Sequence, residues 1–261
     1  MRNTISNRLA RNGSEWADVY SRHQSGTYNN QFMVVDYKRM GEGGKQLQDG
    51  FLTVLEQLPT LIVARDQTAV LRRQTYWSSY NVPFYGEIFS KAGYEAKVAK
   101  YGDYFSYNMT ARARIFRREQ SSVTDISSLF RLMRLNNFKT DPLSRCEQCS
   151  PVPNAYYAIA SRGDLNDPNG KYPMRGLGEH LMGAIDAKIT SSELSAHLEM
   201  VAVGGPTHLN EPPFDWRKVP VKQRNTVHQG QPSEWNFAPV HTQWSNISDA
   251  IGGFHHFAVT V

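Results

Sequence analysis

FLTVLEQLPTLIVARD, residues 51 to 66, is the stretch that most strongly constrains how this chain folds. It consists of two short apolar runs that meet at Pro59, a residue type that favours turns. The stretch therefore predicts the two strands of one hairpin. QFMVVDYK, residues 31 to 38, is another short apolar run without helical period, and it predicts a buried strand of the same sheet.

Helical patterns lie on both sides of these strands in the sequence. Residues 1 to 24 predict a helix that is broken at Asn12-Gly13, with Ser14 as the N-cap of its second piece. Residues 68 to 75 predict a short helix. Helices and strands are thus expected to alternate in the first part of the chain.

Two further helical patterns follow. Residues 84 to 102 predict two helical pieces that are separated by Gly93. DISSLFRLMRLNNF, residues 125 to 138, has the clearest amphipathic period, and Asp125 is expected to cap its start. The side chains expected to face the core are Ile126, Leu129, Phe130, Leu132 and Met133.

The second half of the chain is less regular. Residues 139 to 182 are rich in Pro, Gly, Asn and Asp, which predicts a long irregular segment. Residues 183 to 190 alternate like a strand, and residues 191 to 203 fit a helix or a strand equally well. Because neither an internal repeat nor a low-complexity linker interrupts the sequence, a single domain is expected.

The overall composition is that of a globular protein. Of the 261 residues, 40% are hydrophobic and 11% aromatic, which is enough for a sizeable core. The net charge is +5, but the densest basic stretch, residues 111 to 120, is interrupted by Ile115 and Phe116 and predicts a partly solvated helix face rather than a nucleic-acid-binding stripe. No run approaches the roughly 18 apolar residues of a membrane span.

The two cysteines bear on the cellular compartment. Cys146 and Cys149 form a CxxC pair, which fits half a zinc site, a redox pair or a structural disulfide. A zinc site needs two more ligands, and there is no second CxxC; the flanking prolines Pro142, Pro151 and Pro153 do not fit a redox pair at a helix start. A disulfide is the favoured interpretation, and it implies an oxidising compartment.

Three N-x-[ST] sequons, at Asn12, Asn108 and Asn246, agree with a secretory route. The first residues of the chain are polar and lack the apolar core of a signal peptide, which read alone indicates the cytosol. The CxxC pair and the sequons indicate the secretory route, whereas the first residues contain no signal peptide. Together these features predict a truncated or processed chain.

Catalytic motifs are scarce. There is no Gly-rich phosphate loop, G-x-S-x-G elbow or HExxH motif, so neither a metal nor a cofactor is predicted. The tripeptide Arg162-Gly163-Asp164 is interpreted as a chance match to an adhesion motif, and the alternating Asp186 and Lys188 predict a structural ion pair. If both cysteines are bonded, the chain has no free thiol, and the residues alone identify no nucleophile.

TYWSSYNVPF, residues 75 to 84, places one amide side chain, Asn81, among aromatic residues. One interpretation is a turn, because Asn tolerates unusual backbone angles and Pro83 restricts the residue before it. The other is a hydrogen-bond donor aimed at negative charge that develops during a reaction. Spacing alone favours the turn.

Several longer phrases, taken together, resemble a known family. They are ADVYSRHQSGTYNNQFMVVDYK, LTVLEQLP, TYWSSYNVPF, YGDYFSYN, RARIFRR, LFRLMRLNNFKTDPLSRCEQC, SRGDLNDPNGKYP, GAIDAKIT and HQGQPSEWNFAPV. In this order they resemble the C-terminal part of the phospholipase B-like proteins of the lamina-ancestor group, which are lysosomal or secreted N-terminal-nucleophile hydrolases. The resemblance covers residues 2 to 244, and residues 245 to 261 form a divergent tail.

The resemblance implies an α+β fold, a four-layer αββα sandwich that is incomplete in this chain. It implies a nucleophilic Cys, exposed by self-cleavage, on an N-terminal fragment outside this sequence. Asn81 matches the family's oxyanion donor, in a pocket walled by the surrounding aromatics. Arg112 matches its active-site Arg, with Arg114 as the nearest competitor. The resemblance also implies that Cys146 and Cys149 form a disulfide.

The substrate implied is a lipid or an acylated small molecule, cleaved at an ester or amide bond without a cofactor. The chain alone is expected to be inactive. The competing hypothesis is a truncated, non-catalytic fragment or a binding module of the lysosomal or secretory pathway.

Overall fold

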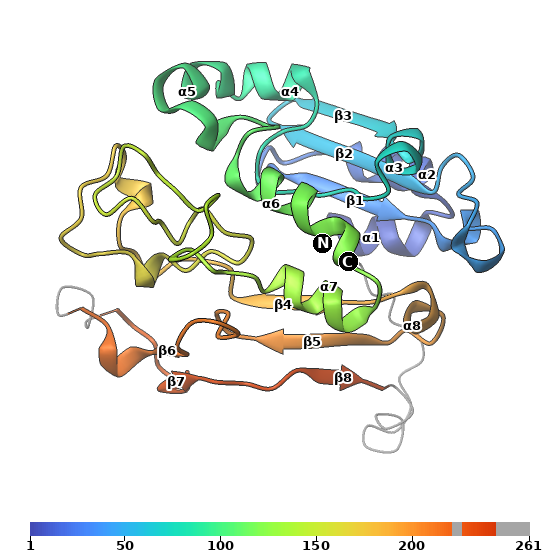
Figure 1. The fold of residues 1–261 in the computed structure, drawn as a ribbon. Coiled ribbons are helices and arrows are strands. Elements are labelled where there is room, and N and C mark those ends of the chain that lie inside the picture. The colour runs from blue at the N-terminus through green and yellow to red at the C-terminus, as the bar shows by residue number, and fades with distance from the viewer. Residues whose placement is uncertain (221–225, 244–261) are drawn as a thin grey trace. The chain divides into compact units, whose positions relative to one another are not determined.

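The computed structural model describes residues 1–220 and 226–243, which form a mixture of helices and sheets (Figure 1). The chain divides into two compact units: the first unit begins at Met1 and runs to Tyr107, and the second unit begins at Asn108. An α+β fold is confirmed. The single domain and the four-layer sandwich stay predictions, and the tail from residue 245 lies outside the described residues.

The first unit is built on a three-stranded antiparallel sheet in the order β1-β2-β3. Its strands are β1 (Gln31–Val35), β2 (Leu52–Leu58) and β3 (Leu61–Asp66). Leu58 pairs with Leu61 across a two-residue turn, in which Thr60 adopts a left-handed φ of 65°. The predicted hairpin is therefore confirmed.

Strand β2 lies in the middle of this sheet and is buried on both faces. On one face, Leu52 and Val54 pack with Phe51, Val63, Tyr85 and Ile88. On the other, Leu55 packs with Trp16, Ala17 and Tyr20. Burying a Leu or Val side chain contributes about 1.5–3 kcal/mol, so this strand is the centre of the unit's stability.

The expectation that β1 is a buried strand was wrong. Met33 is 37% exposed and Val35 is 44% exposed, whereas Phe32 and Val34 pack against the Trp16 cluster. The reason is the position of β1 at the edge of the sheet, where only one face of the strand is covered. A short apolar run does not reveal the order of strands in a sheet.

Helices cover both faces of the sheet, as Figure 1 shows for α1 and α2 on one side. The first unit contains α1 (Arg2–Leu9), α2 (Gly13–Ser21), α3 (Thr68–Gln74), α4 (Gly86–Lys91) and α5 (Tyr94–Tyr101). The predicted break at residues 12–13 is confirmed, but the N-cap of α2 is Asn12, not Ser14, because the Asn12 side chain accepts a hydrogen bond from the Glu15 amide at 2.9 Å. Gly93, with φ 75°, separates α4 from α5 as predicted.

The second unit contains three helices and two small sheets among its described residues. Its helices are α6 (Ala111–Glu119), α7 (Ile126–Met133) and α8 (Ser192–Ala196). Strands β4 (Asp186–Ile189), β5 (Met200–Gly204) and β8 (Val240–Thr242) form one antiparallel sheet, and β6 (Phe214–Asp215) pairs with β7 (Glu234–Trp235). The stretch from 191 to 203 is thus a helix followed by a strand.

Short 3-10 helices connect these elements in both units. They are η1 (Tyr37–Arg39), η2 (Glu42–Gly44), η3 (Gly102–Phe105), η4 (Gln120–Ser122), η5 (Gly163–Leu165), η6 (Arg175–Leu177) and η7 (Trp216–Lys218). Within the described ranges, no helix has both the length and the apolar character needed to cross a membrane.

Helix α7 begins at the predicted residue, but the side chains that it buries differ from the predicted ones. Asp125 caps it, and the Ser128 side chain completes a capping box. Ser128 and Leu132, one turn apart, are its buried residues, while Met133 is 40% exposed. The expectation that Met133 packs inward was wrong, because the buried stripe is centred on Ser128 and Leu132.

The predicted irregular segment, residues 139 to 182, contains only η5 and η6 as regular structure. Within it, Arg162 is 1% exposed. Its side chain forms a two-pronged ion pair with Asp164 at 2.6 and 2.8 Å and donates to the Pro212 carbonyl. The charged groups of Arg162-Gly163-Asp164 are therefore used inside the unit. The predicted ion pair between Asp186 and Lys188 is confirmed.

Candidate functional site

The segment between α3 and α4 carries Asn81. Thr75 ends α3 in a left-handed conformation, and the chain then turns back over the first unit. The side chains of Tyr80 and Val82 are buried, and the Tyr80 hydroxyl donates to the Tyr107 carbonyl at 2.7 Å. Because the residues before and after Asn81 are both buried, this part of the segment is held against the unit.

Glu56, on β2, fixes the far end of the same segment. Its side chain is buried, with 2% exposed, and accepts hydrogen bonds from the backbone amides of Phe84 at 2.7 Å and Tyr85 at 2.9 Å. The Gln31 side chain donates a third hydrogen bond at 2.7 Å. Three donors satisfy the buried carboxylate and anchor the segment on the central strand.

Asn81 itself lies between these anchored points. Its φ is 62°, and its carbonyl accepts a hydrogen bond from the Tyr94 hydroxyl at 2.8 Å. The turn is therefore confirmed, since Asn is among the few residues that enter the left-handed region readily. Asn81 is exposed in this chain, and the pocket walled by aromatics stays a prediction. The role as an oxyanion donor stays a prediction.

The aromatic residues near Asn81 in the sequence pack on one another. Phe84 contacts Trp77 and Tyr107 edge-on, with ring centroids 4.8 and 5.5 Å apart. Burial raises the pKa of Tyr107, and the negative charge of Glu56 adds to this effect. The Tyr107 phenol therefore keeps its proton at neutral pH.

Arg112 lies in the first turn of α6. Its side chain is half-buried, whereas that of Arg114 is exposed. A cation in the first turn of a helix is disfavoured by the helix dipole, so α6 gains no stability from having Arg112 there. The half-buried side chain distinguishes Arg112 from Arg114, and the role of Arg112 as an active-site residue stays a prediction.

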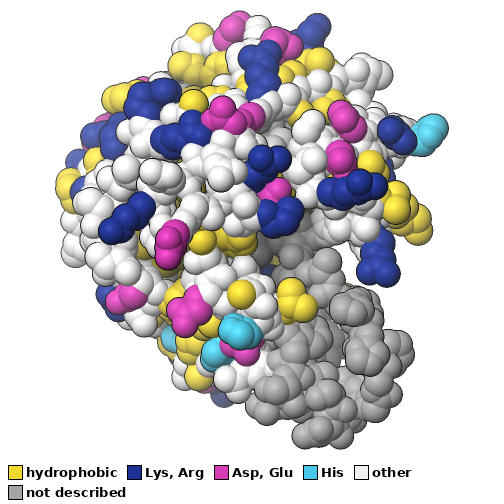
Figure 2. Space-filling model, turned by 90° about the vertical axis from the view of Figure 1, so that its right-hand side faces the viewer, with side chains coloured by type: hydrophobic (Ala, Val, Ile, Leu, Met, Phe, Trp, Pro, Cys, Tyr) yellow, Lys and Arg dark blue, Asp and Glu magenta, His cyan; other side chains and the backbone are white. Residues whose placement is uncertain are grey.

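The rest of α6 confirms the predicted partly solvated face. Ile115 and Phe116 are buried, while Arg117 and Arg118 are exposed. On the face of the molecule drawn in Figure 2, Lys and Arg side chains are interspersed with Asp and Glu. This mixture of charges does not favour a phosphate-tracking stripe.

Asn81 belongs to the first unit and Arg112 to the second. A site that contains both residues stays a prediction.

Cys146 and Cys149 form a disulfide, as predicted. Both residues are buried, at 3% and 5% exposed. Because these are the two cysteines of the chain, it has no free thiol that could serve as a nucleophile.

The sequons differ in their surroundings. Asn12 caps α2, and its side-chain amide donates to Glu15 at 3.3 Å. Asn108 is exposed. Asn246 lies outside the described residues. Glycosylation at all three stays a prediction.

Glu56 is the residue that the sequence analysis missed. The sequence feature that could have pointed to Glu56 is its position as the single acidic residue inside the apolar run LTVLEQLP. A buried charge in such a run needs hydrogen-bond partners. Its partners Phe84 and Tyr85 lie 28 and 29 residues further along the chain, and the local pattern does not identify them.

Comparison with known proteins identifies the family. Residues 1–242 match the family model for phospholipase B. The chain belongs to the phospholipase B family. It is 49% identical to "Putative phospholipase B-like 2" of Rattus norvegicus over 244 residues, which are 94% of this chain and 41% of that protein.

Two further relatives support the same assignment. The chain is 46% identical to "Putative phospholipase B-like 1" of Caenorhabditis elegans, over 94% of this chain and 43% of that protein. It is 39% identical to "Phospholipase B-like 1" of Rattus norvegicus, over 89% of this chain and 38% of that protein. The chain thus spans about two fifths of the length of the curated relatives it matches.

Proposed function

We propose that this chain is the supporting part of an acyl hydrolase that cleaves an ester or amide bond of a lipid or acylated small molecule. The family supports hydrolysis as the class of reaction. The observation that carries the proposal is the segment anchored by Glu56, which holds an exposed Asn81 in a fixed left-handed turn. A donor fixed before the reaction costs little to reorganise when charge develops.

In this proposal an N-terminal Cys is supplied by polypeptide outside residues 1–261, and together the parts complete an αββα sandwich. The Cys sulfur attacks the acyl carbon, and its own α-amine takes the thiol proton. The Asn81 amide donates to the oxyanion, and Arg112 orients the groups around the nucleophile. The alcohol or amine leaves with that proton, and water then hydrolyses the thioester.

We further propose that the complete protein is a lysosomal or secreted glycoprotein. The disulfide between Cys146 and Cys149 supports an oxidising compartment. The exposed Asn108 is the sequon among the described residues that offers an accessible side chain.

The test is made in the complete protein, including the polypeptide that carries the Cys. Asn81→Asp keeps the shape of the side chain and removes the amide donor, and Asn81→Gly removes the side chain while tolerating the positive φ. Both variants are expected to lower kcat for fatty-acid release by about 10²–10³, the usual cost of losing one oxyanion donor. Asn169→Asp, at an exposed position, is the matched control.

The melting temperatures of the variants separate a catalytic from a structural role. The hydrolase proposal expects them to stay near that of the wild type. Wild-type turnover in both Asn81 variants would contradict the proposal, and it would favour a non-catalytic fragment or binding module.

A further inference from the structure

Strand β1 forms one edge of the sheet in the first unit (Figure 1). Backbone hydrogen bonds at its two ends determine which of its residues face β2. The Asn30 carbonyl accepts from the Gln57 amide at 3.1 Å, and the Asp36 amide donates to the Phe51 carbonyl at 2.8 Å. In an antiparallel pair, residues that bond to the partner strand alternate with residues whose amide and carbonyl point away from it. The even-numbered residues of β1 therefore bond to β2.

The odd-numbered residues of β1 direct their backbone groups to the open edge. Gln31 satisfies its amide locally, because that amide donates to the Asn30 side-chain oxygen at 2.9 Å. The amides and carbonyls of Met33 and Val35 have no hydrogen-bond partner within residues 1–220 and 226–243. Both side chains are also exposed. These two positions thus combine an unpaired backbone with an exposed apolar side chain.

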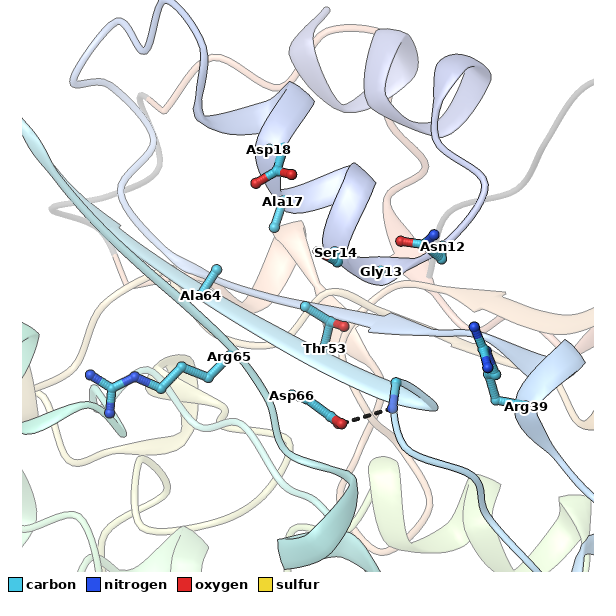
Figure 3. Close-up of a pocket in the computed structure, with 11 residues that line it drawn as sticks. Asn12, Gly13, Ser14, Ala17, Asp18, Arg39, Thr53, Ala64, Arg65 and Asp66 are labelled. Atoms are coloured by element: carbon cyan, nitrogen blue, oxygen red, sulfur yellow. Dashed lines mark hydrogen bonds between the residues drawn. The ribbon is translucent and has the colours of Figure 1, made fainter.

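The opposite edge of the sheet, β3, is protected by charges. It carries Arg65 and Asp66, and charged side chains on an edge strand discourage pairing with another strand. The Asp66 carboxylate accepts from the Gly50 amide at 2.7 Å, beside a cavity of about 420 Å³ between α2 and the sheet (Figure 3). Strand β1 has the sequence QFMVV, which contains neither a charge nor Pro. An apolar edge without such protection is typical of a strand that pairs with another strand in the assembled protein.

The open edge lies beside the anchor of the Asn81 segment. Gln31 pairs with Glu56 in the register of β1 and β2, and its side chain donates to the Glu56 carboxylate at 2.7 Å. Because side chains alternate between the two faces of a strand, Met33 and Val35 lie on the same face as Gln31. A polypeptide that covered these two side chains would therefore adjoin the hydrogen bonds that hold the Asn81 segment.

We propose that an extended strand of the polypeptide that carries the nucleophilic Cys pairs with β1 at Met33 and Val35. The identity of this polypeptide rests on the proposed hydrolase function. The chain covers 41% of "Putative phospholipase B-like 2" of Rattus norvegicus, so about three fifths of that relative's length lies outside the matched part and would supply such a strand. The added strand would bond to the free amides and carbonyls of both residues and cover their side chains with apolar residues of its own.

The test is amide hydrogen exchange, resolved to single residues, on the chain alone and on the complete protein that includes this polypeptide. In the chain alone, the amides of Met33 and Val35 should exchange rapidly. In the complete protein they should exchange more slowly by about tenfold or more, because the pairing must then open before exchange occurs. The amides of Phe32 and Val34, which face β2, are the internal control and should exchange slowly in both samples.

Two proline variants test the position of the added strand. Val35→Pro removes an amide that faces away from β2, where an edge strand tolerates Pro. In the complete protein it should speed exchange at the Met33 amide by about fivefold to tenfold, since one hydrogen bond of the pairing is lost. The matched control is Ala64→Pro on β3. The Gln67 amide donates to the Leu52 carbonyl at 2.7 Å, so the exposed Ala64 also directs its amide away from β2. This control should leave exchange at Met33 unaltered.

Equal exchange of Met33 and Val35 in the chain alone and in the complete protein would overturn the proposal, as would equal effects of Val35→Pro and Ala64→Pro. Slow exchange in the chain alone that is lost on dilution would also overturn it, because the covering strand would then belong to a second copy. Asn81→Asp should leave exchange at β1 unchanged. Slow exchange at β1 together with wild-type turnover in the Asn81 variants would contradict the hydrolase proposal alone, and lowered turnover in these variants with rapid exchange at β1 would contradict the strand pairing alone.

Discussion

Glu56 shows how one buried carboxylate determines the geometry of a distant segment. It accepts hydrogen bonds from two consecutive backbone amides, Phe84 and Tyr85, and from the Gln31 side chain. An isolated charge in an apolar core is costly, but a carboxylate with three donors is stable there. The conformation of the loop that carries Asn81 therefore depends on Glu56, a residue buried beneath that loop.

Glu56→Gln is expected to lower the free energy of unfolding by about 1–3 kcal/mol, because the new amide group faces backbone donors. Chemical denaturation measures this loss. The control is Glu87→Gln, an exposed partner of Arg65, which should change stability by less than about 0.5 kcal/mol. Equal stabilities of the two variants would show that Glu56 does not anchor the loop.

At the scale of elements, the contact between α2 and β2 depends on the absence of a side chain. Gly13 lies against the Thr53 side chain, with no room for a Cβ. Gly13→Ala should therefore reduce stability by about 1–3 kcal/mol, the usual cost of overpacking. Gly86→Ala is the matched control, because Gly86 also begins a helix and has no atom within 4 Å of the added Cβ. Thermal unfolding of both variants compares them, and an equal effect would contradict the close contact.

Helix α6 is tied to the irregular segment of the second unit by an ion pair. Arg118 donates to both oxygens of Asp141, at 2.8 and 2.6 Å, and these bonds hold the pKa of Asp141 below its ordinary value. A lowered pKa in the folded state stabilises the protein above the unfolded pKa of about 3.9. That contribution is lost as the pH falls through the folded value.

Asp141→Asn should therefore reduce stability by about 1 kcal/mol at pH 7, a modest effect because Arg118 is partly exposed. Asn keeps an acceptor for the Leu143 amide, so the change isolates the ion pair. The difference from the wild type should shrink as the pH is lowered below about 4. A difference that is constant from pH 7 to pH 3 would exclude this ion pair as its cause.

The ends of helices and strands could be predicted wherever they are determined by neighbouring residues in the sequence. The hairpin at Pro59, the break at residues 12–13 and the stop at Gly93 each follow from turn chemistry. The exposure of β1 depends on strand order, and the Glu56 contacts depend on residues far along the chain. For the candidate site, the turn at Asn81 was predictable from residue type, but its exposed side chain was not.

At the scale of the whole molecule, the chain is a member of the phospholipase B family that covers about two fifths of its relatives' length. Its two cysteines are joined in a disulfide. The proposal therefore divides the work of catalysis. In this proposal, this chain would supply the oxyanion donor and a positioning arginine, and another stretch of polypeptide would supply the nucleophile.

The most direct test of this division is N-terminal sequencing of every polypeptide that copurifies with the chain from its native source. The proposal predicts a polypeptide, either a partner or an extension of this chain, whose first residue is a newly exposed Cys. Purified protein that begins at Met1 and contains no second polypeptide would contradict it, because both cysteines of such a protein are joined in the disulfide and no thiol is free.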